Sequence, residues 1–168
     1  VGEVGRVLDA IDSHKLAENT LVIFTSDNGA VLHRDALEAG HRANSGLLGQ
    51  KTDAWEGGHR MPFIVRWPGR VKAGTVSEQT ICFTDLLATF AEICGAELPT
   101  DAGPDSFSFL PTLVGAESLR TQRARTAIVC DGWKGDYSIR DGQWKLILPA
   151  PDFPKLRSSP ELFDMRKD

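Results

Sequence analysis

The residues best suited to chemistry follow an apolar segment in the first part of the chain. Asp27 and Asn28 follow the apolar run at residues 20–25 after a single residue, Ser26, and Gly29 comes next. A carboxylate and an amide carbonyl at the end of a rigid strand offer two oxygens to a hard cation such as Ca²⁺ or Mg²⁺. The same residues are also typical of a simple tight turn, because Asp and Asn side chains bond the local backbone and Gly permits positive φ. The pattern therefore leaves a metal site and a plain turn as alternatives.

A second group of charged residues lies further along the chain. Lys51 occupies a Gly-rich segment, where an ammonium group could bind an oxyanion as a compact charge, although a solvated surface lysine is the alternative. His59 and Arg60 follow paired glycines, which allow the backbone to approach another group closely. Either side chain could face a substrate. Arg60 could instead form a structural ion pair with Glu56.

The first half of the chain predicts alternating helices and strands. An amphipathic helix is expected at the start, with a buried face made of Val4, Val7, Leu8 and Ile11. The run at residues 20–25 has no polar alternation, as in a strand covered on both faces of a parallel sheet. A second short strand is predicted at residues 62–67. The long loop between them, with a short helix near residues 35–39, lies where α/β sheets place their ligands.

The next segment predicts one more helix, followed by a loop. Thr84 or Asp85 is expected to cap a helix that ends at Gly95. Its predicted buried face consists of Leu86, Leu87, Phe90 and Ile93. A Pro-, Gly- and Asp-rich segment at residues 99–104 follows. We therefore predict a boundary near residue 100, with residues 1–100 forming an α/β domain and residues 101–168 a small subdomain.

Short strand-like segments dominate the predicted subdomain. After a helical turn near residues 107–114, strands are expected at residues 126–130, 137–140, 144–148 and 162–163. Asp141 and Gly142 form a turn signal that fits a hairpin with two residues at its tip. The subdomain is therefore predicted to be a small antiparallel sheet.

The composition of the chain argues against binding to nucleic acid and against a membrane span. The formal net charge of −4, without any run of Arg or Lys, does not favour nucleic acid. The apolar stretches are much shorter than the roughly 20 residues of a membrane span.

Trp55 and Trp67 are interpreted as packing residues rather than as a sugar-stacking platform. His33 and His41, on the long loop, could shape a substrate pocket.

Three stretches of the sequence together resemble the type I sulfatase family. They are residues 24–29 (Phe-Thr-Ser-Asp-Asn-Gly), Lys51 with residues 55–62 (Trp-Glu-Gly-Gly-His-Arg-Met-Pro), and residues 67–69 (Trp-Pro-Gly). The resemblance extends over essentially the whole chain. It implies an alkaline-phosphatase-like α/β fold, in which Asp27 and Asn28 bind Ca²⁺, or Mg²⁺ as the alternative, and Lys51 binds the sulfate of a sulfate ester.

The family nucleophile is a formylglycine, made from Cys or Ser in a C/S-x-P-S/A-R motif. That motif is absent from this chain, since Cys82, Cys94 and Cys130 are each followed by other residues. We therefore expect the chain to be the C-terminal part of a sulfuric ester hydrolase, inactive by itself, with the nucleophile outside it. A phosphodiesterase or phosphonate hydrolase of the same superfamily, and a non-catalytic metal-binding domain, remain the alternatives.

The resemblance also gives expectations about partners and compartment. The substrate would be a sulfated small molecule or glycan. Similar enzymes are mostly periplasmic, secreted or lysosomal, and the same is expected here. A chain cut at this point would expose a strand edge and an apolar face, so the fragment is expected to self-associate.

Overall fold

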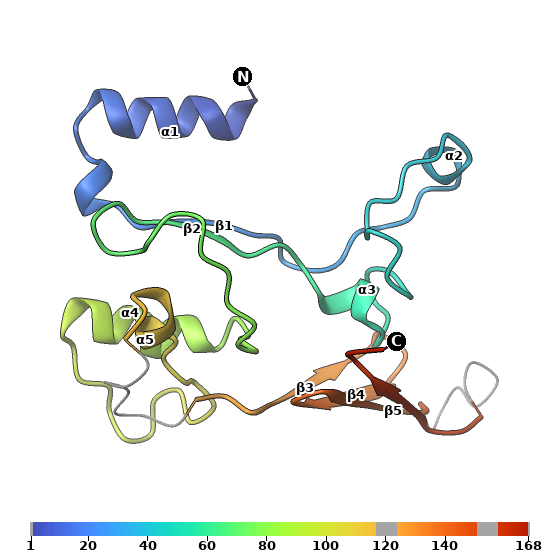
Figure 1. Cartoon of the computed structure of the whole chain (residues 1–168). Helices are drawn as coiled ribbons and strands as arrows, with labels where there is room; N and C mark the ends of the chain where they lie inside the picture. The colour runs from blue at the N-terminus through green and yellow to red at the C-terminus, as the bar shows by residue number, and fades with distance from the viewer. Residues whose placement is uncertain (1, 117–123, 151–157, 168) are drawn as a thin grey trace. The chain divides into compact units, whose positions relative to one another are not determined.

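The structure is a computed structural model that describes residues 2–116, 124–150 and 158–167 (Figure 1). The chain forms two compact units. The first comprises Val1–Phe24 and Phe63–Arg125, and the second comprises Thr25–Pro62 and Thr126–Asp168. Each unit is described by itself below. The boundary predicted near residue 100 stays a prediction.

The first unit contains three helices, a 3₁₀ turn and a short two-stranded sheet among its described residues. In chain order these are α1 (Glu3–Ser13), η1 (Ala17–Asn19), β1 (Val22–Phe24), β2 (Ile64–Arg66), α4 (Asp85–Cys94) and α5 (Leu110–Leu113). The helices predicted near residues 107–114 and after residue 84 are both present. Gly95 ends α4 with a φ of 63°, as its position after the last apolar residue predicts.

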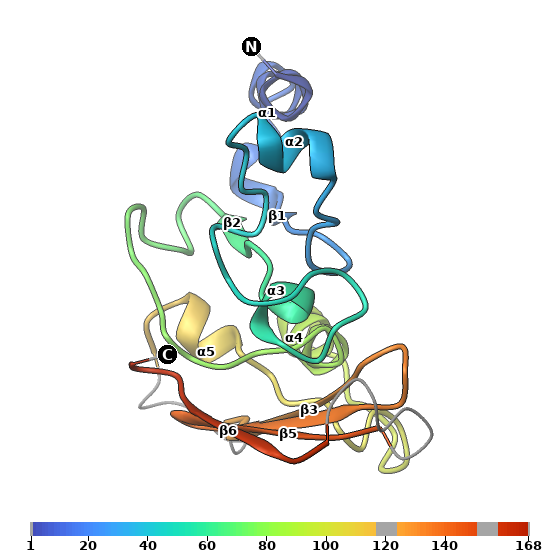
Figure 2. The same ribbon diagram turned by 90° about the vertical axis from the view of Figure 1, so that its right-hand side faces the viewer.

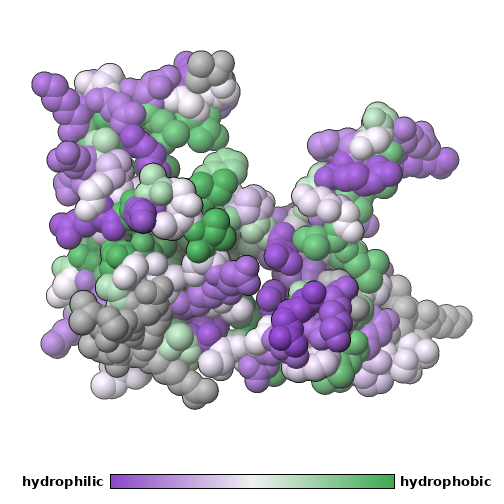
Figure 3. Space-filling view, in the orientation of Figure 1, coloured by the Kyte–Doolittle hydropathy of each residue, from purple (hydrophilic) through white to green (hydrophobic). Residues whose placement is uncertain are grey.

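The strand predicted at residues 20–25 differs from the expectation in its pairing. Within the part of the chain that the structure describes, β1 pairs only with β2, and the pairing is antiparallel. Phe24 and Ile64, which face each other across the pair, are 44% and 59% exposed. Figure 3 shows apolar surface in the region of these strands. The described residues thus show an antiparallel pair in place of the expected parallel one, because β2 returns beside β1 in the opposite direction, and β1 is covered only in part.

The predicted buried faces of the two long helices are covered only in part, since Leu8, Ile11, Leu86 and Ile93 are half-buried and the other apolar residues of those faces are exposed. None of the α1 residues is buried, and Val4 and Val7 are 48% and 58% exposed. In α4, Leu87 and Phe90 are 47% and 42% exposed, whereas the buried residues are Asp85, Ala88 and Thr89. The buried side of α4 is polar because it faces a backbone segment: Ser106 Oγ accepts the Ala88 N–H, and Thr89 Oγ1 accepts the Phe109 N–H.

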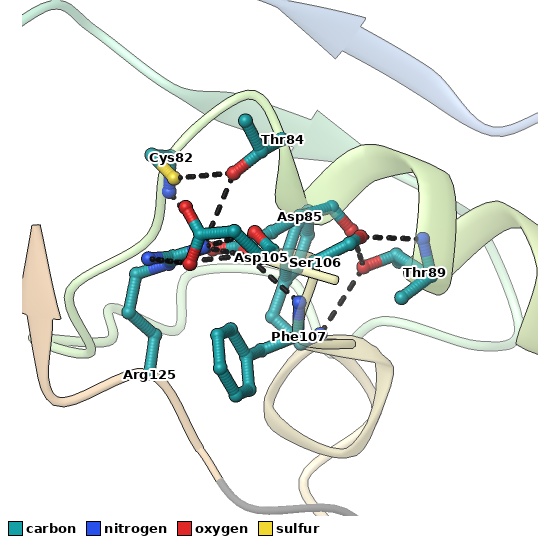
Figure 4. Close-up of polar contacts among 10 residues, drawn as sticks. Cys82, Thr84, Asp85, Thr89, Asp105, Ser106, Phe107 and Arg125 are labelled. Carbon is teal, nitrogen blue, oxygen red and sulfur yellow. Dashed lines mark hydrogen bonds and ion pairs between the residues drawn. The ribbon is translucent and has the colours of Figure 1, made fainter. Parts of the chain in front are cut away.

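A buried ion pair lies at the start of α4 (Figure 4). The Arg125 guanidinium contacts the Asp85 carboxylate at 2.8 Å, and the two side chains are 4% and 1% exposed. Asp85 also accepts the backbone N–H groups of Cys82 and Phe107, at 3.0 and 2.9 Å. The hydrogen bond to Asp85 raises the pKa of Arg125 above its already high usual value. Thr84 occupies the N-cap of α4 without a side-chain cap hydrogen bond, and Asp85, the first residue of the helix, joins three separate segments through its carboxylate.

The second unit carries two short helices and a four-stranded antiparallel sheet. Its elements are α2 (Arg34–Glu38), α3 (Glu56–His59), β3 (Ala127–Asp131), β4 (Tyr137–Asp141), β5 (Trp144–Leu148) and β6 (Glu161–Asp164). The strands pair in sequence order, and α3 lies over one face of the sheet (Figures 1 and 2). The short helix and the small antiparallel sheet are confirmed, as is the predicted two-residue hairpin tip after Asp141.

The other face of this sheet is apolar and exposed. Val129, Ile139, Leu146 and Leu162 face one another across the four strands. Val129 and Leu162 are 67% and 63% exposed. Exposed apolar surface of this kind would support the predicted self-association, which stays a prediction.

Candidate functional site

The turn that carries Asp27 and Asn28 is joined by backbone hydrogen bonds to the Lys51 segment and to α3. The Gly29 N–H donates to the Gly58 carbonyl at 2.8 Å, and the Lys51 N–H donates to the Ala30 carbonyl at 2.9 Å. These segments lie far apart in the sequence. Because the bonds join main chains, they fix where each side chain begins, independently of its own conformation. The structure thus brings together the backbones of the residues that the sequence selects as a site.

Glycines make this approach possible. A Cβ on Gly29 would overlap the carbonyl oxygen of Gly57, and one on Gly57 would overlap the carbonyl oxygen of Gly49. A Cβ on Gly58 would similarly overlap the carbonyl oxygen of Asp53. Gly29, Gly57 and Gly58 are all buried. The paired glycines before His59 therefore serve close main-chain packing inside the protein.

Replacing Gly29 by Ala is expected to destabilise the fold by about 1–3 kcal/mol, because overpacking against a main-chain carbonyl displaces backbone. Denaturant unfolding of the variant checks the value. Gly2→Ala is the control for an added methyl group that meets nothing within 4 Å at a φ of −71°, and it should cost no more than about 1 kcal/mol, because Gly2 is the N-cap of α1, where Ala is less favourable than Gly. Equal stability of the Gly29 variant and the wild type would show that the two segments do not pack as described.

Lys51 is exposed and precedes a residue in an unfavourable conformation. Thr52 has a φ of 82°, which is uncommon for any residue with a Cβ and worse for a β-branched one. The Thr52 carbonyl accepts the backbone N–H of Trp133 at 2.9 Å. Strained residues of this type persist where the surroundings hold them, and they occur often at functional sites. The backbone beside Lys51 is therefore fixed from the β3–β4 loop.

A buried acidic side chain connects α3 to the sheet. Glu56 accepts hydrogen bonds from Lys145 Nζ at 2.9 Å and from Arg140 at 3.3 Å. The Glu56 and Lys145 side chains are 13% and 4% exposed, so this pair is shielded from water. The Trp55 indole donates to Glu161 on β6 at 3.1 Å. Trp55 thus contacts the sheet, in agreement with its interpretation as a packing residue.

His59 and Arg60 lie at the end of α3 in different environments. His59 is half-buried, and its Nε2 atom is buried without a hydrogen-bond partner among the described residues. Burial lowers the pKa of His59 and the charge of Lys145 lowers it further, while Glu56 opposes the shift. The imidazole is therefore neutral at pH 7. Arg60 is exposed, and its guanidinium lies 4.0 Å from Glu56, so the ion pair considered as its alternative role is present.

Asp27 and Asn28 fit part of a site for a hard cation. Asp27 is exposed, and the Asn28 amide donates its N–H to the Gly29 carbonyl at 3.1 Å, which turns the Asn28 side chain back over the turn. Carboxylate and amide oxygens suit Ca²⁺ or Mg²⁺, but Ca²⁺ takes about 6–8 oxygens. In the described ranges, no three His, Cys, Asp or Glu residues cluster in a way that could hold a metal. These two residues could supply only a minority of the ligands that such an ion needs.

His33 and His41 line a small hollow beside α2. Its volume is about 150 Å³, and apolar side chains, including Val31 and Leu37, form much of its wall. Both histidines lie on the long loop after the Asp27 turn, as the sequence predicts. The hollow is smaller than the roughly 300–1,000 Å³ of a typical ligand pocket.

Sequence reasoning missed the charged residues that hold the site from the sheet. Lys145 is buried in β5 between exposed Trp144 and half-buried Leu146, and Arg140 lies directly opposite it on β4. A strand alternation that places Lys on the inward side was a signal for a buried ionic contact. The identity of its partner, Glu56, could not be read from the strand alone. The backbone N–H of Trp133 donates to the Thr52 carbonyl, and no sequence pattern in its turn predicts this contact.

The chain matches the sulfatase family over residues 2–96. It is 36% identical to an N-acetylgalactosamine-6-O-sulfatase of Bacteroides thetaiotaomicron, over 98% of this chain and 34% of that protein. It is also 37% identical to the steryl-sulfatase of Homo sapiens, over 93% of this chain and 28% of that protein. The chain thus spans about a third or less of the length of these relatives.

Solved structures agree with the sequence matches. A Bacteroides thetaiotaomicron structure described in connection with the metabolism of multiple glycosaminoglycans superposes with a TM-score of 0.79 at 35% identity, covering 98% of this chain and 36% of its own. A second structure, described as a complex with its substrate D-glucosamine-2-N,6-O-disulfate, gives a TM-score of 0.73 at 27% identity, covering 98% of this chain and 31% of its own.

These matches define a segment of an alkaline-phosphatase-like α/β fold, and the predicted fold class is confirmed. The chain belongs to the sulfatase family. None of the helices in the described part of the chain has the length and hydropathy needed to span a bilayer.

Proposed function

We propose that this chain is the C-terminal part of a sulfuric ester hydrolase and supplies the metal-binding turn and the sulfate-binding lysine of its active site. The observation that carries the proposal is the pair of main-chain hydrogen bonds from Gly29 to Gly58 and from Lys51 to Ala30. They join two of the three sequence stretches on which the family resemblance depends, residues 24–29 and Lys51 with residues 55–62. The formylglycine nucleophile would lie outside this chain.

In this proposal Lys51 stabilises negative charge on the sulfuryl oxygens. Hydrolysis of a sulfate monoester develops charge on both the attacking and the leaving oxygen, so a site requires positive charge already in position. Lys51 is exposed, and its backbone is fixed on both sides, by Ala30 at its own N–H and by Trp133 at the Thr52 carbonyl. A fixed backbone with a flexible side chain lets the ammonium reach the anion without rearranging the fold.

Asp27 and Asn28 would hold a divalent cation, with Ca²⁺ preferred over Mg²⁺ because the family resemblance favours it. Both oxygens are hard donors at the end of a strand, and the site needs further ligands from outside the described residues. A bound cation would supply Lewis-acid stabilisation of the sulfate oxygens. His59, neutral and half-buried, and exposed Arg60 are proposed to border the substrate from the end of α3.

The substrate class proposed for the whole enzyme is a sulfated sugar. Relatives that match 98% of this chain include an N-acetylgalactosamine-6-O-sulfatase and a structure in complex with a disulfated glucosamine. A periplasmic, secreted or lysosomal compartment is proposed on the family resemblance alone.

The full-length enzyme is expected to hydrolyse a sulfated hexosamine and to lose at least about 90% of its turnover when a chelator removes the divalent cation. Re-addition of Ca²⁺ should restore the activity. Sulfate release, measured by ion chromatography, provides the readout.

Two comparisons decide between this proposal and its alternatives. A phosphate diester or phosphonate assayed under the same conditions should react far more slowly than the sulfate ester. Faster phosphoryl transfer would assign the enzyme to the phosphodiesterase or phosphonate hydrolase class. Absence of turnover of all these substrates by the full-length protein would instead support a non-catalytic metal-binding role.

A further inference from the structure

Trp133 is a large aromatic side chain on the surface of the second unit. It is 80% exposed, more than any other tryptophan among the described residues. Leaving a side chain of this size in water forgoes the stabilisation of about 1.5–3 kcal/mol that burial of a large apolar side chain provides. A single exposed apolar side chain is common on protein surfaces, so its meaning depends on what lies beside it.

The turn that carries Trp133 is tightly bonded. The Gly132 N–H donates to the Asp136 carbonyl at 2.6 Å, and the Gly135 N–H donates to the Gly132 carbonyl at 3.0 Å. Gly132 is buried, and a Cβ there would overlap the Asp136 carboxylate. A short turn closed by two hydrogen bonds holds the backbone of Trp133 in one position. An indole on such a base loses little conformational entropy when a ligand stacks on it.

The position of this turn links it to the proposed site. The Trp133 N–H donates to the carbonyl of Thr52, the residue directly after Lys51. The Trp133 turn therefore borders the Lys51 end of the proposed site, and these residues all belong to the second unit.

We propose that Trp133 is a substrate-binding residue that stacks against the pyranose ring of the sulfated sugar while Lys51 binds its sulfate. The CH-rich face of a pyranose is apolar enough to pack on an indole, whereas its sulfate needs a cation, so the two residues recognise different parts of one ligand. This inference rests on the proposed function and names a specificity residue for it.

The other tryptophans do not fit this role. The Trp55 indole donates to Glu161, and the Arg70 guanidinium lies 5.9 Å from the ring centroid of Trp67. Trp144 is 47% exposed but starts β5, at the end of β4 opposite to the Trp133 turn. Trp144 is therefore a matched control for an exposed indole on the same sheet.

The test compares Trp133→Ala, Trp133→Phe and Trp144→Ala in the full-length enzyme. Trp133→Ala is expected to raise the KM for a sulfated hexosamine about tenfold, because the stacked ring is lost. The Ki of inorganic sulfate, a competitive inhibitor without a ring, should stay within twofold. Trp133→Phe should recover most of the affinity, and Trp144→Ala should leave KM unchanged.

Three outcomes would overturn the inference. An unchanged KM in Trp133→Ala would show that Trp133 does not stack on the sugar. A similar weakening of sulfate and sugar, together with a lower Tm, would assign Trp133 a structural role. An equal effect of Trp144→Ala would show that any exposed indole on the sheet behaves alike. Failure of the proposed function is distinguishable, because Lys51→Ala would then leave the Ki of inorganic sulfate unchanged.

Discussion

Replacing Lys51 by Ala in the full-length enzyme is expected to lower kcat for a sulfate ester about 10²–10³-fold, the effect of removing one preorganised charge stabiliser. The ammonium acts on charge that develops during the reaction, so kcat should fall more than KM rises. Folding should be unaffected, because the side chain is exposed and the hydrogen bond to Ala30 comes from the Lys51 backbone. Steady-state kinetics would measure the fall in kcat, and an unchanged Tm would show that the fold is intact.

Two variants sharpen the Lys51 experiment. Lys51→Arg keeps the charge but spreads it over a planar group, so it should recover only part of the rate. Lys72→Ala removes an exposed lysine from the other unit and should change kcat less than twofold. A loss below about threefold in Lys51→Ala would exclude this residue from the active site.

Local pairing in the second unit could be predicted from the sequence. The strands of the small sheet follow one another closely, and Gly142 sits at the tip of a two-residue hairpin with a φ of 55°. Such contacts join neighbours in the chain, so the residues that form them are visible together. The α2 helix and the Gly95 terminus of α4 are local features in the same sense.

Burial could not be predicted equally well, because it depends on what covers each face. The apolar spacing of α4 suggested that Leu87 and Phe90 were buried, whereas the covered side carries Asp85 and Thr89. Periodicity identifies a helix with two different faces. It does not show that a polar face can be buried when a neighbouring backbone segment offers N–H groups, as Phe107 and Phe109 do here.

The candidate site, too, could be predicted from the sequence only in part. Asp27, Asn28 and Lys51 could be selected from residue type and family resemblance, and the hydrogen bonds of Gly29 and Lys51 agree with that selection. The role of Gly57 and Gly58 was harder to read, because close approach to a substrate and close approach to another main chain require the same residue. Only coordinates show that carbonyl oxygens occupy the space a Cβ would need.

The buried pair of Arg125 and Asp85 supports the prediction with the largest expected effect on stability. Arg125→Ala would leave the Asp85 carboxylate, 1% exposed, without its guanidinium partner. Removing one member of a buried ion pair costs about 3–5 kcal/mol, because the remaining charge stays desolvated and uncompensated. The Phe107 ring, 4.9 Å from the guanidinium carbon, would lose its cation–π contact as well. Denaturant unfolding of the full-length protein would measure the loss.

Further variants separate the ionic contribution from simple loss of packing. Arg34→Ala breaks an ion pair whose side chains are 93% and 65% exposed, and it should cost less than about 0.5 kcal/mol. The double variant Asp85→Asn with Arg125→Met removes both charges and keeps side-chain volume, so its cost should be smaller than that of Arg125→Ala alone. A double variant that is less stable than Arg125→Ala would show that Asp85 is required mainly as an acceptor for the Cys82 and Phe107 N–H groups. Asp85 would then join the three segments through its backbone contacts, with Arg125 as a secondary partner.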